Sequence, residues 1–280
     1  MSPRLAIIIV NFNARDWLEK CLRSIYTQDI ARQLEVIVVD SASTDDSVAM
    51  MRREFPCCKC IESQENLGFG RGNNVGAEQS VAPILLFLNP DTEVSTGALG
   101  DLLQFMEEHP DYGAAGGKIF DGDGELERSA GTWPTLSSLI LDRMLKRWPV
   151  SRNRFEHLAH HHWNYDRLRE VGWVTGAYLW IRRDLFERLG GFDRDIFMYY
   201  EDVDLCYRLK KLGSQIFFFP GAPIIHYRNK TPIRDKRRKR LMQQGLYQFS
   251  LNHYAWGCHG LTRLVTYLIY RCIYSGDKYL

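Results

Sequence analysis

The sequence predicts an α/β protein built on a mostly parallel central sheet. The first observation is a set of short runs of Val, Ile and Leu at residues 5–10, 35–39 and 84–88. Continuous apolar runs, unlike alternating ones, indicate strands that are covered on both faces. The second observation is that segments with the apolar spacing of helices separate these runs. The third is that a carboxylate closely follows two of the runs, at the strand ends where open α/β sheets bind ligands.

The first 120 residues supply the alternating elements that this fold class requires. Between the first two strands, Trp17, Cys21, Leu22 and Ile25 recur at helical spacing, which predicts a helix over 16–26. A second helix is predicted over 46–55, and a short strand over 59–61. The strand at 84–88 ends at Asn89-Pro90-Asp91.

The second half of the chain predicts fewer and shorter elements. Strands are expected at 173–181, 215–219 and 224–227, the last two separated by Pro220-Gly221. A short helix is expected over 184–189, with Asp184 as N-cap and Glu187 completing a capping box. A further helix is expected over 201–212, closed by Gly213. Residues 121–170 are polar and irregular, which predicts loops and short helices.

Positive charge is concentrated near the C-terminus. The net charge of the chain is +2, but residues 228–240 hold eight basic side chains and one acidic one, which leaves −5 for the rest. Beyond this tract, apolar residues from Leu261 to Ile273 form one helical face. A basic, amphipathic extension of this kind suits an anionic membrane surface, packing against the preceding domain, or an oligomer contact. One short basic tract does not indicate a nucleic-acid binder.

Length and composition indicate a cytosolic globular protein. The chain has 280 residues, enough for one large domain with an extension. No apolar segment reaches the length of a membrane span, and the N-terminus lacks the pattern of a signal peptide. The seven cysteines are odd in number, and three lie within 57–60, a spacing that fits reduced thiols better than a zinc site or a disulfide framework.

Two carboxylates follow predicted strands and could face one ligand. Asp40 ends the strand at 35–39, and Asp91 follows the strand at 84–88. Because the carboxyl ends of parallel strands share one edge of a sheet, we expect the two side chains on the same side of the molecule. Asp is also common in ordinary turns, so this placement alone leaves both interpretations open.

A glycine-rich segment at 66–76 is the next candidate for ligand binding. Its four Gly, its Asn residues and Arg71 predict a loop whose backbone approaches a phosphate or a sugar. Asn73 stands where a dinucleotide fingerprint would have its third Gly, and no Gly-Lys-Ser/Thr follows, so neither of the two common phosphate-binding motifs is present. A glycine-rich turn without a ligand is the alternative.

Three acidic residues open the helix predicted at 201–212. Glu201, Asp202 and Asp204 follow Tyr199-Tyr200, whose rings could line a pocket. Asp202 falls on the apolar side of the helix, where a carboxylate could accept a proton from a bound hydroxyl. Negative charge at a helix N-terminus is also favourable by itself, so surface capping is the competing explanation. His226 ends the last strand, where a structural role and a ligand role are both open.

These residues together resemble the family 2 glycosyltransferases, and among them the rhamnosyltransferase-like branch. The resemblance extends from Ile7 to His226, and its specificity lies in the order and spacing of the motifs. The matching motifs are Val10-Asn11-Phe12-Asn13, Val39-Asp40 through Ser47, Asn66 to Gly70 with Asn73, Leu88 to Thr92, Thr175-Gly176-Ala177, Arg182-Arg183, Gly190 to Asp193, and Tyr200 to Leu205.

The resemblance implies a GT-A fold and transfer of a sugar from a nucleoside diphosphate to an acceptor hydroxyl, with inversion at the anomeric carbon. It implies that Asp40 binds the pyrimidine base and that Asp202 is the general base. It implies that Asp91, with Asn89 at the weaker first position of the family's metal motif, holds Mg²⁺ or Mn²⁺. A His on a later strand often completes that metal site, here His226, although Tyr227-Arg228 follows it where the family has small residues.

On this resemblance, donor-binding residues are expected at several motifs: Val10, Asn11, Asn13, Asp40, Ser43, Gly68, Arg71, Asn73, Asn89 and Asp91. Acceptor-binding residues are expected to be Trp173, Gly176, Tyr200 and Glu201. The catalytic domain is expected over 1–227, with a nucleotide-sugar half at 1–120 and an acceptor half at 121–227, and the extension over 228–280.

The branch favours dTDP-rhamnose as donor, and a UDP-hexose or a UDP-N-acetylhexosamine is the alternative. The expected acceptor is a glycan or lipid-linked glycan, as in the synthesis of bacterial surface polysaccharides, at the cytoplasmic face of the inner membrane. Two other classes remain open, a non-catalytic sugar-nucleotide scaffold and a nucleotidyltransferase. The carboxylates at 91, 201 and 202 argue against the first, and the absence of a basic Gly-rich loop after the first strand argues against the second.

Overall fold

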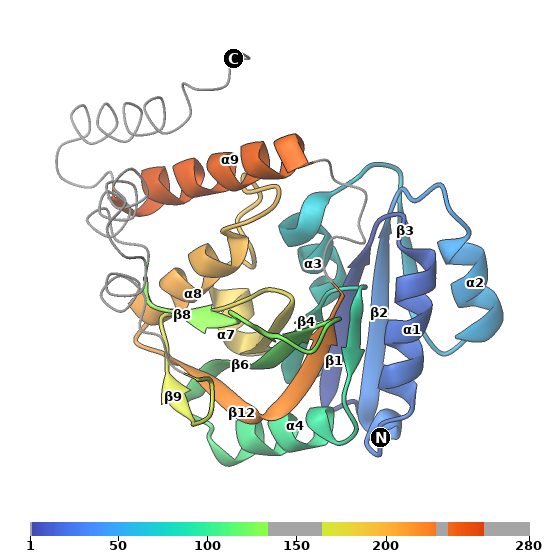
Figure 1. Ribbon diagram of the computed structural model, residues 1–280, viewed down its shortest axis with the longest axis horizontal. Coiled ribbons are helices and arrows are strands. Elements are labelled where there is room, and N and C mark those ends of the chain that lie inside the picture. The colour runs from blue at the N-terminus through green and yellow to red at the C-terminus, as the bar shows by residue number, and fades with distance from the viewer. Residues whose placement is uncertain (1, 134–163, 228–234, 255–280) are drawn as a thin grey trace.

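The computed structural model describes residues 2–133, 164–227 and 235–254 (Figure 1). A mixed ten-stranded sheet forms its centre, in the order β3-β2-β1-β4-β11-β6-β12-β5, with β7 paired to β6 and β9 to β12. The strands of this sheet are β1 (Leu5–Asn11), β2 (Leu34–Ser41), β3 (Lys59–Ser63), β4 (Ile84–Leu88), β5 (Thr92–Val94), β6 (Tyr112–Asp121), β7 (Leu126–Glu127), β9 (Arg169–Glu170), β11 (Tyr178–Arg182) and β12 (Gln215–His226). A separate two-stranded ribbon pairs β8 (Ala130–Gly131) with β10 (Trp173–Val174).

The helices lie in two layers on the faces of this sheet, as the sequence predicts for an α/β fold. Their bounds are α1 (Arg15–Tyr26), α2 (Ser47–Glu54), α3 (Gly68–Glu78), α4 (Ala98–Glu108), α7 (Arg183–Arg188), α8 (Glu201–Lys211) and α9 (Asp235–Tyr254), with one 3₁₀ turn at Ala31–Gln33. Alternate residues of β1 face the two layers. Leu5, Ile7 and Ile9 pack into a core with α1, α2 and α4, whereas Ala6 and Ile8 pack into a core with α3, α7 and α8. The burial of β1 on both faces therefore explains its unbroken apolar run.

The N-terminal half confirms the predicted parallel strands. β1 pairs in parallel with β2 and with β4, and β2 pairs in parallel with β3. The register places Asn11 opposite Asp40 at the carboxyl ends of β1 and β2. The ends of β1, β2 and β4 therefore present their polar residues along one edge of the sheet.

The glycine-rich segment is a helix, so the prediction of a loop at 66–76 was wrong. Helix α3 begins at Gly68, and it packs so closely on the sheet that a Cβ at Gly76 would lie 2.4 Å from Ile8. A Cβ at Gly72 would lie 2.8 Å from Val10, and one at Gly70 would lie 3.1 Å from Phe192. Gly normally disfavours helices by about 1 kcal/mol each relative to Ala. Here tertiary packing overrides that preference, because only Gly allows the helix to approach so closely.

The second half departs from the predicted strands in two places. The expected strand 173–181 is divided into β10 and β11 by a turn at Thr175–Ala177. The expected strands 215–219 and 224–227 form one strand, β12, which passes through Pro220-Gly221 with a shift of register against β6 between Phe219 and Ile224. A bulge of this kind absorbs the proline without ending the strand.

The helix predicted at 184–189 is present, but the predicted capping box is wrong. Helix α7 begins at Arg183, its N-cap is Arg182, and no side-chain cap bond is made. Glu187 instead accepts a hydrogen bond from Arg183 one turn earlier, at 2.7 Å. The helix predicted at 201–212 is confirmed as α8, and Gly213 follows it at a φ of 83°, the left-handed conformation that ends helices.

The basic tract enters helix α9, which contacts α8. The side chains of Lys236, Arg237, Lys239 and Arg240 are exposed on its first turns. The first part of the tract and the amphipathic segment at 261–273 lie outside the described residues. Within the described ranges, no helix is both long enough and apolar enough to cross a bilayer.

Candidate active site

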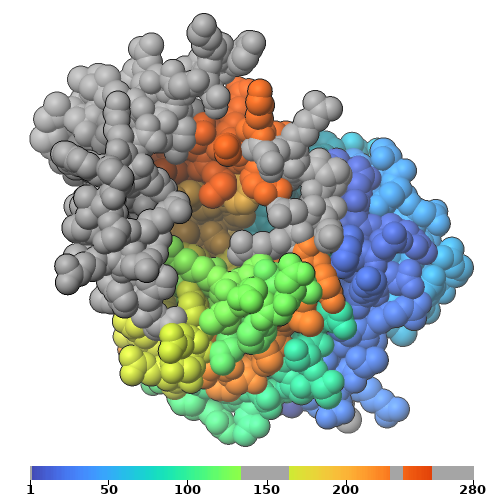
Figure 2. All heavy atoms as spheres, in the orientation of Figure 1, coloured from blue at the N-terminus to red at the C-terminus, as the bar shows by residue number. Residues whose placement is uncertain are grey.

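The predicted site residues come from both halves of the chain and gather near the carboxyl ends of β1, β2 and β4. Figure 2 shows the blue N-terminal part at one side of the molecule and most of the green, yellow and orange later parts toward the other. β4 lies beside β11, and the backbone N–H of Asn89, just after β4, donates to the carbonyl of Ala177, just before β11, at 3.2 Å. The two halves therefore meet where the carboxylate-bearing segments begin.

Asp40 is the centre of a buried polar network between β1 and β2. Asn11 Nδ2 donates to Asp40 Oδ1 at 2.8 Å, and the backbone N–H of Ser43 donates to Asp40 Oδ2 at 2.9 Å. Ser43 Oγ also accepts from Asn11 Nδ2 at 3.2 Å and from the backbone N–H of Asn13 at 2.9 Å. Asp40 is only 2% exposed and Asn11 is fully buried, so these hydrogen bonds hold both side chains in place.

Helix α3 places the other predicted donor residues along β1. Asn73 is fully buried and donates from Nδ2 to the carbonyl of Phe69 at 3.0 Å. Arg71 pairs with Glu65 at 3.0 Å and stays partly exposed. Gly68, at a φ of 72°, lies against Phe197, whose carbonyl oxygen would be 2.4 Å from an added Cβ. The segment before α8, and not an open ligand space, therefore approaches the start of α3.

Asn89, Asp91 and His226 meet at the junction of β4, β5 and β12. His226 Nε2 lies 3.2 Å from Asp91 Oδ1 and 3.2 Å from Asn89 Nδ2. The pairing of β12 with β5 fixes this geometry, because it places His226 opposite Thr92. Glu127, on β7, was missed in the sequence, and its Oε2 lies 3.3 Å from His226 Nδ1. Only the hairpin of β7 with β6 brings it there, so no local motif could have identified it.

The charges around His226 favour its protonated form. Burial alone would lower the pKa of His226, but the hydrogen bonds and negative charges of Asp91 and Glu127 outweigh it and raise the pKa to about 9. Such a site stabilises positive charge next to two carboxylates.

The donor atoms of this group fit a divalent cation in part. Two neighbouring ligands of one octahedral Mg²⁺ lie about 3 Å apart, close to the separation of Asp91 Oδ1 and His226 Nε2. In the protonated form Nε2 donates its hydrogen to Asp91, and a bound cation would have to replace that proton while Nδ1 keeps its hydrogen bond to Glu127. Among the described residues, no group of three or more His, Cys, Asp or Glu is placed to hold a metal ion. Asp91 and His226 therefore offer at most two of the ligands that a divalent cation takes.

Asp202 is held by two backbone amides at the start of α8. Oδ2 accepts from the N–H of Gly176 at 2.8 Å, and Oδ1 accepts from the N–H of Val203 at 2.8 Å. Burial raises the pKa of Asp202, and these amides with Thr175 offset part of the increase. Gly176 lies between the Asp202 side chain and the ring of Phe69. A Cβ added at Gly176 would lie 2.9 Å from that ring. The carboxylate is therefore oriented by the turn that divides β10 from β11.

Glu201 precedes Asp202, and few hydrogen bonds offset the burial of its carboxyl group. Its side chain is 6% exposed, and Oε2 has no hydrogen-bond partner among the described residues. Burial raises the pKa of Glu201 well above its ordinary value, and the negative charge of Asp202 raises it further. The neutral form is therefore favoured in the folded protein.

We expect Glu201→Gln to make the protein more stable than the wild type near neutral pH. Because the folded-state pKa is raised, the wild type loses stability as pH rises from the unfolded value toward the folded one. Gln stays neutral, so the gain in Tm should be smallest at pH 4 and should increase as the pH rises toward the raised pKa of Glu201. Thermal unfolding across this range checks it, with the exposed Glu78→Gln as control. Equal Tm values for Glu201→Gln and wild type at pH 8 would contradict the burial argument.

The predicted acceptor residues are placed in two different ways. Tyr200 precedes Asp202 in the left-handed region, with a φ of 68°, and Tyr199 has the same value. Non-glycine residues in this region cost of order 1–3 kcal/mol each, so the surrounding structure must hold them. Trp173 instead contacts the residues on either side of β8. Its Nε1 donates to the carbonyl of Thr132 at 2.9 Å, and the Arg128 guanidinium lies 5.4 Å from the centre of its ring.

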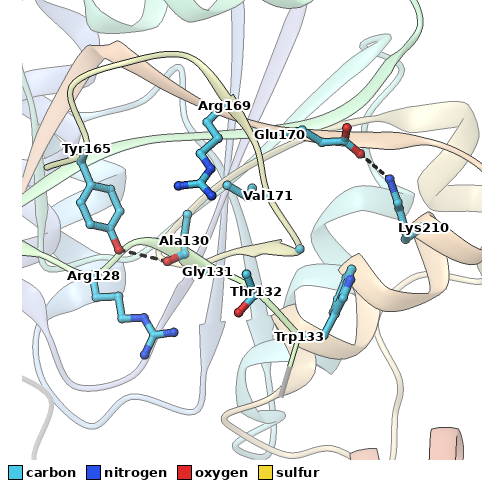
Figure 3. A pocket seen from close by; sticks show the side chains of 11 residues that line it. Arg128, Ala130, Gly131, Thr132, Trp133, Tyr165, Arg169, Glu170, Val171 and Lys210 are labelled. Carbon is cyan, nitrogen blue, oxygen red and sulfur yellow. Dashed lines mark hydrogen bonds and ion pairs between the residues drawn. The ribbon is translucent and has the colours of Figure 1, made fainter. Parts of the chain in front are cut away.

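A pocket of about 260 Å³ lies beside the β8–β10 ribbon, and the sequence did not predict it (Figure 3). Figure 3 shows the guanidinium groups of Arg128 and Arg169 near the ring of Tyr165, and Lys210 paired with Glu170 at the far side. The residues that line it are Arg128, Ala130, Gly131, Thr132, Trp133, Tyr165, Arg169, Glu170, Val171, Gly172 and Lys210. Trp173, Gly176, Tyr200 and Glu201 are not among them. The backbone N–H of Thr175 donates to the carbonyl of Ser129 at 2.8 Å, which connects this ribbon to the turn that holds Asp202.

Sequence comparison relates the chain to proteins that transfer sugars. The family described as glycosyl transferase family 2 matches residues 6–190. An N-acetylglucosaminyl-diphospho-decaprenol L-rhamnosyltransferase from Mycobacterium tuberculosis is 30% identical over 247 residues, covering 84% of this chain and 80% of that protein. The rhamnosyltransferase WbbL from Escherichia coli K12 is 26% identical over 235 residues, covering 79% of this chain and 82% of its own length.

Comparison of structures gives the same fold. A mannosyltransferase from Pyrobaculum calidifontis, in complex with GDP-Man and Mn²⁺, superposes with a TM-score of 0.62 at 20% identity, over 100% of this chain and 77% of that one. TarS from S. aureus, in complex with UDP, superposes with a TM-score of 0.59 at 17% identity, over 96% of this chain and 70% of that one. These likenesses concern the arrangement of helices and strands.

Proposed function

Because the chain belongs to glycosyl transferase family 2, we propose that this hexosyltransferase moves rhamnose from dTDP-rhamnose to a hydroxyl of a lipid-linked glycan. The GT-A fold expected from the sequence is confirmed. The single observation that carries the proposal is the connection between two groups of carboxylates. Both groups are hydrogen-bonded to the turn at Thr175–Ala177. The N–H of Gly176 donates to Asp202, and the carbonyl of Ala177 accepts from the N–H of Asn89. Asn89 lies beside Asp91 and His226.

The choice of donor and acceptor rests on the relatives. Two of them are named as rhamnosyltransferases, and one name specifies a sugar linked through a diphosphate to decaprenol. At 30% identity the donor can still differ, so a UDP-hexose or a UDP-N-acetylhexosamine is the alternative donor. The Asp40 network suits a pyrimidine in either case, since a fixed carboxylate can accept a hydrogen bond from the ring N–H that uracil and thymine share.

In the proposed reaction Asp202 is the general base. The acceptor hydroxyl oxygen attacks the anomeric carbon, its proton passes to the Asp202 carboxylate, and the bond between the anomeric carbon and the phosphate oxygen breaks. The electron pair of that bond leaves with the nucleoside diphosphate. A single displacement inverts the configuration, and it requires no covalent nucleophile on the protein. The amides of Gly176 and Val203 keep Asp202 oriented for this transfer.

The leaving nucleoside diphosphate carries negative charge that the site must accommodate. Asp91 and His226 would hold a divalent cation, which supplies charge neutralisation of the diphosphate when it is bound. Asn11, Asp40 and Ser43 would hold the base, and Arg71 on α3, which is partly exposed, would share the charge of the diphosphate. Asn73 is fully buried and would act within α3, through its hydrogen bond to the carbonyl of Phe69. The protein's own contribution is to keep these groups fixed before the donor arrives.

A product assay tests the proposal. Purified protein is incubated with Mn²⁺, a polyprenyl-diphospho-N-acetylglucosamine acceptor, and either dTDP-rhamnose or a panel of UDP-sugars. We expect release of dTDP with a new rhamnoside of inverted configuration. Transfer from a UDP-sugar alone would refute the donor, and dTDP release that leaves the acceptor unmodified would refute the acceptor. Release of pyrophosphate would indicate nucleotidyl transfer instead.

We also propose that the exposed basic turns of α9 meet an anionic bilayer at the cytoplasmic face, where a polyprenyl acceptor is held. Lys236, Arg237, Lys239 and Arg240 are exposed together, and each Lys or Arg near such a surface contributes about 1 kcal/mol. Co-sedimentation with liposomes should therefore require anionic lipid and should weaken at high salt. Binding that ignores lipid charge would point to packing or oligomerisation as the role of this helix.

A further inference from the structure

Helix α9 lies beyond the matched family region and packs against the segment that carries Asp202. The family match ends at residue 190, whereas α9 extends over Asp235–Tyr254. In Figure 1 the gold segment that precedes α8 reaches up to α9. Two groups of contacts connect α9 to this segment, one before Asp202 and one after it.

The contact before Asp202 is a close approach of two backbones. Gly245 of α9 is buried, and a Cβ at this position would lie 2.1 Å from the carbonyl oxygen of Tyr199 and 3.4 Å from that of Met198. Tyr199 and Tyr200 both have a φ of 68°, a conformation that non-glycine residues rarely adopt. The helix backbone therefore lies directly against the strained turn that leads into Glu201 and Asp202.

The contact after Asp202 is a buried ionic network. Asp204 is fully buried, and its Oδ1 lies 2.6 Å from His253 Nε2 of α9. Its Oδ2 accepts from Arg208 Nε at 2.7 Å, and Arg208 also donates to the carbonyls of Leu189 and Gly191. A buried carboxylate that loses one of these partners is strongly destabilised, so the orientation of α8 depends on α9.

Aromatic packing and one further hydrogen bond join these two contacts. Phe249 is fully buried between them, with its ring centroid 6.1 Å from that of Tyr200 and 5.7 Å from that of Tyr207. Asn252 Nδ2 donates to Asp193 Oδ2 at 2.6 Å. The turn and the first helical turn of α8 are therefore held from one side by a single element.

We infer that α9 is a positioning element of the active site, and that Gly245 and His253 fix the Tyr199–Tyr200 turn and α8 so that Asp202 faces the acceptor. This inference rests on the proposed role of Asp202 as general base. Neither residue contacts a reacting atom, and both act through the backbone that carries Asp202. Residues 1–227, the expected catalytic domain, would then be insufficient for efficient transfer without α9.

Kinetics of four variants of the full chain test this role. His253→Ala and Gly245→Ala should lower kcat by about tenfold and leave the donor KM within about twofold, since a small misplacement of the base affects the chemical step more than donor binding. His253→Gln, which keeps a donor to Asp204, should restore kcat to within about threefold of wild type. Gln244→Ala, at an exposed neighbouring position of α9, is the matched control and should change nothing. A wild-type kcat in both His253→Ala and Gly245→Ala would overturn the inference.

Amide hydrogen exchange gives a second readout that does not depend on activity. Residues 199–205 should exchange faster in His253→Ala and Gly245→Ala than in the wild type or Gln244→Ala, while β1 stays protected. Unchanged exchange in 199–205 would overturn the positioning role, whatever the protein transfers. If the wild type transfers no sugar but the exchange result is as expected, the proposed function fails and the structural coupling stands.

Discussion

Asp202→Asn is expected to lower kcat by about 10²–10⁴-fold, the usual contribution of a general base. The side chain keeps its size, but an amide cannot take the proton of the acceptor hydroxyl. Each carboxylate oxygen of Asp202 accepts from one backbone N–H, of Gly176 or of Val203. In the variant the NH₂ group of Asn replaces one of these oxygens, so one of the two hydrogen bonds is lost and we expect a modest loss of Tm as well. Donor binding, measured by thermal shift with dTDP-rhamnose, should persist.

The pH dependence of transfer gives a second check on Asp202. Its pKa is raised by burial, so the carboxylate is protonated, and wild-type kcat/KM falls, as pH decreases through that raised value. The variant should lack this acidic limb. The matched control is Asp195→Asn, which removes an exposed carboxylate from the loop before α8. Asp195 has no predicted role in transfer, so this variant should keep the acidic limb. Wild-type turnover by a folded Asp202→Asn protein would exclude Asp202 as the base.

Asp91→Asn is expected to produce the second largest loss, about 10²-fold or more in kcat/KM, with a higher Mn²⁺ concentration needed for half-maximal rate. The substitution keeps the side-chain shape but removes the charge that faces His226 Nε2. An amide oxygen is a weaker ligand than a carboxylate for a hard cation. Treatment of the wild type with EDTA should abolish transfer, and added Mn²⁺ or Mg²⁺ should restore it.

The control for Asp91→Asn is Asp111→Asn, which removes an exposed carboxylate from the turn before β6. It should show the wild-type dependence on Mn²⁺. Transfer that survives EDTA in the wild type, or an Asp91→Asn protein with an unaltered Mn²⁺ requirement, would show that this group does not hold a cation.

The sequence predicted the parallel half of the fold well because local patterns determine it. The runs at 5–10, 35–39 and 84–88 are all strands of the central sheet, and the acids at the helix start of 201–212 lie at the start of α8. The glycine-rich segment misled because Gly indicates a loop when neighbours are ignored. Its helical conformation depends on Ile8 and Val10 of another element, so only the packed structure shows why Gly is required there.

The candidate site could be predicted in composition but not in its connections. Asn11 was named from one motif and Asp40 and Ser43 from another, and the register of β1 against β2 brings them together. Glu127 was missed because it belongs to no motif and reaches His226 only through the β6–β7 hairpin. Gly245 and His253 were missed for the same reason, since their partners are about 45–50 positions away in the chain.

The insertion of β11 between β4 and β6 has a consequence for synthesis on the ribosome. Tyr178 of β11 pairs with Leu88 of β4, so one edge of β4 has no partner until about 90 more residues have been synthesised. At about 5–20 residues per second, the apolar edge of β4 stays open for roughly 5–20 s in the nascent chain. Strand β6 is also unpaired along most of its length at this stage, because both of its long neighbours, β11 and β12, follow it in the sequence. An open strand edge is a template for pairing with other chains, so the risk of aggregation is greatest during this interval, before the finished fold exists.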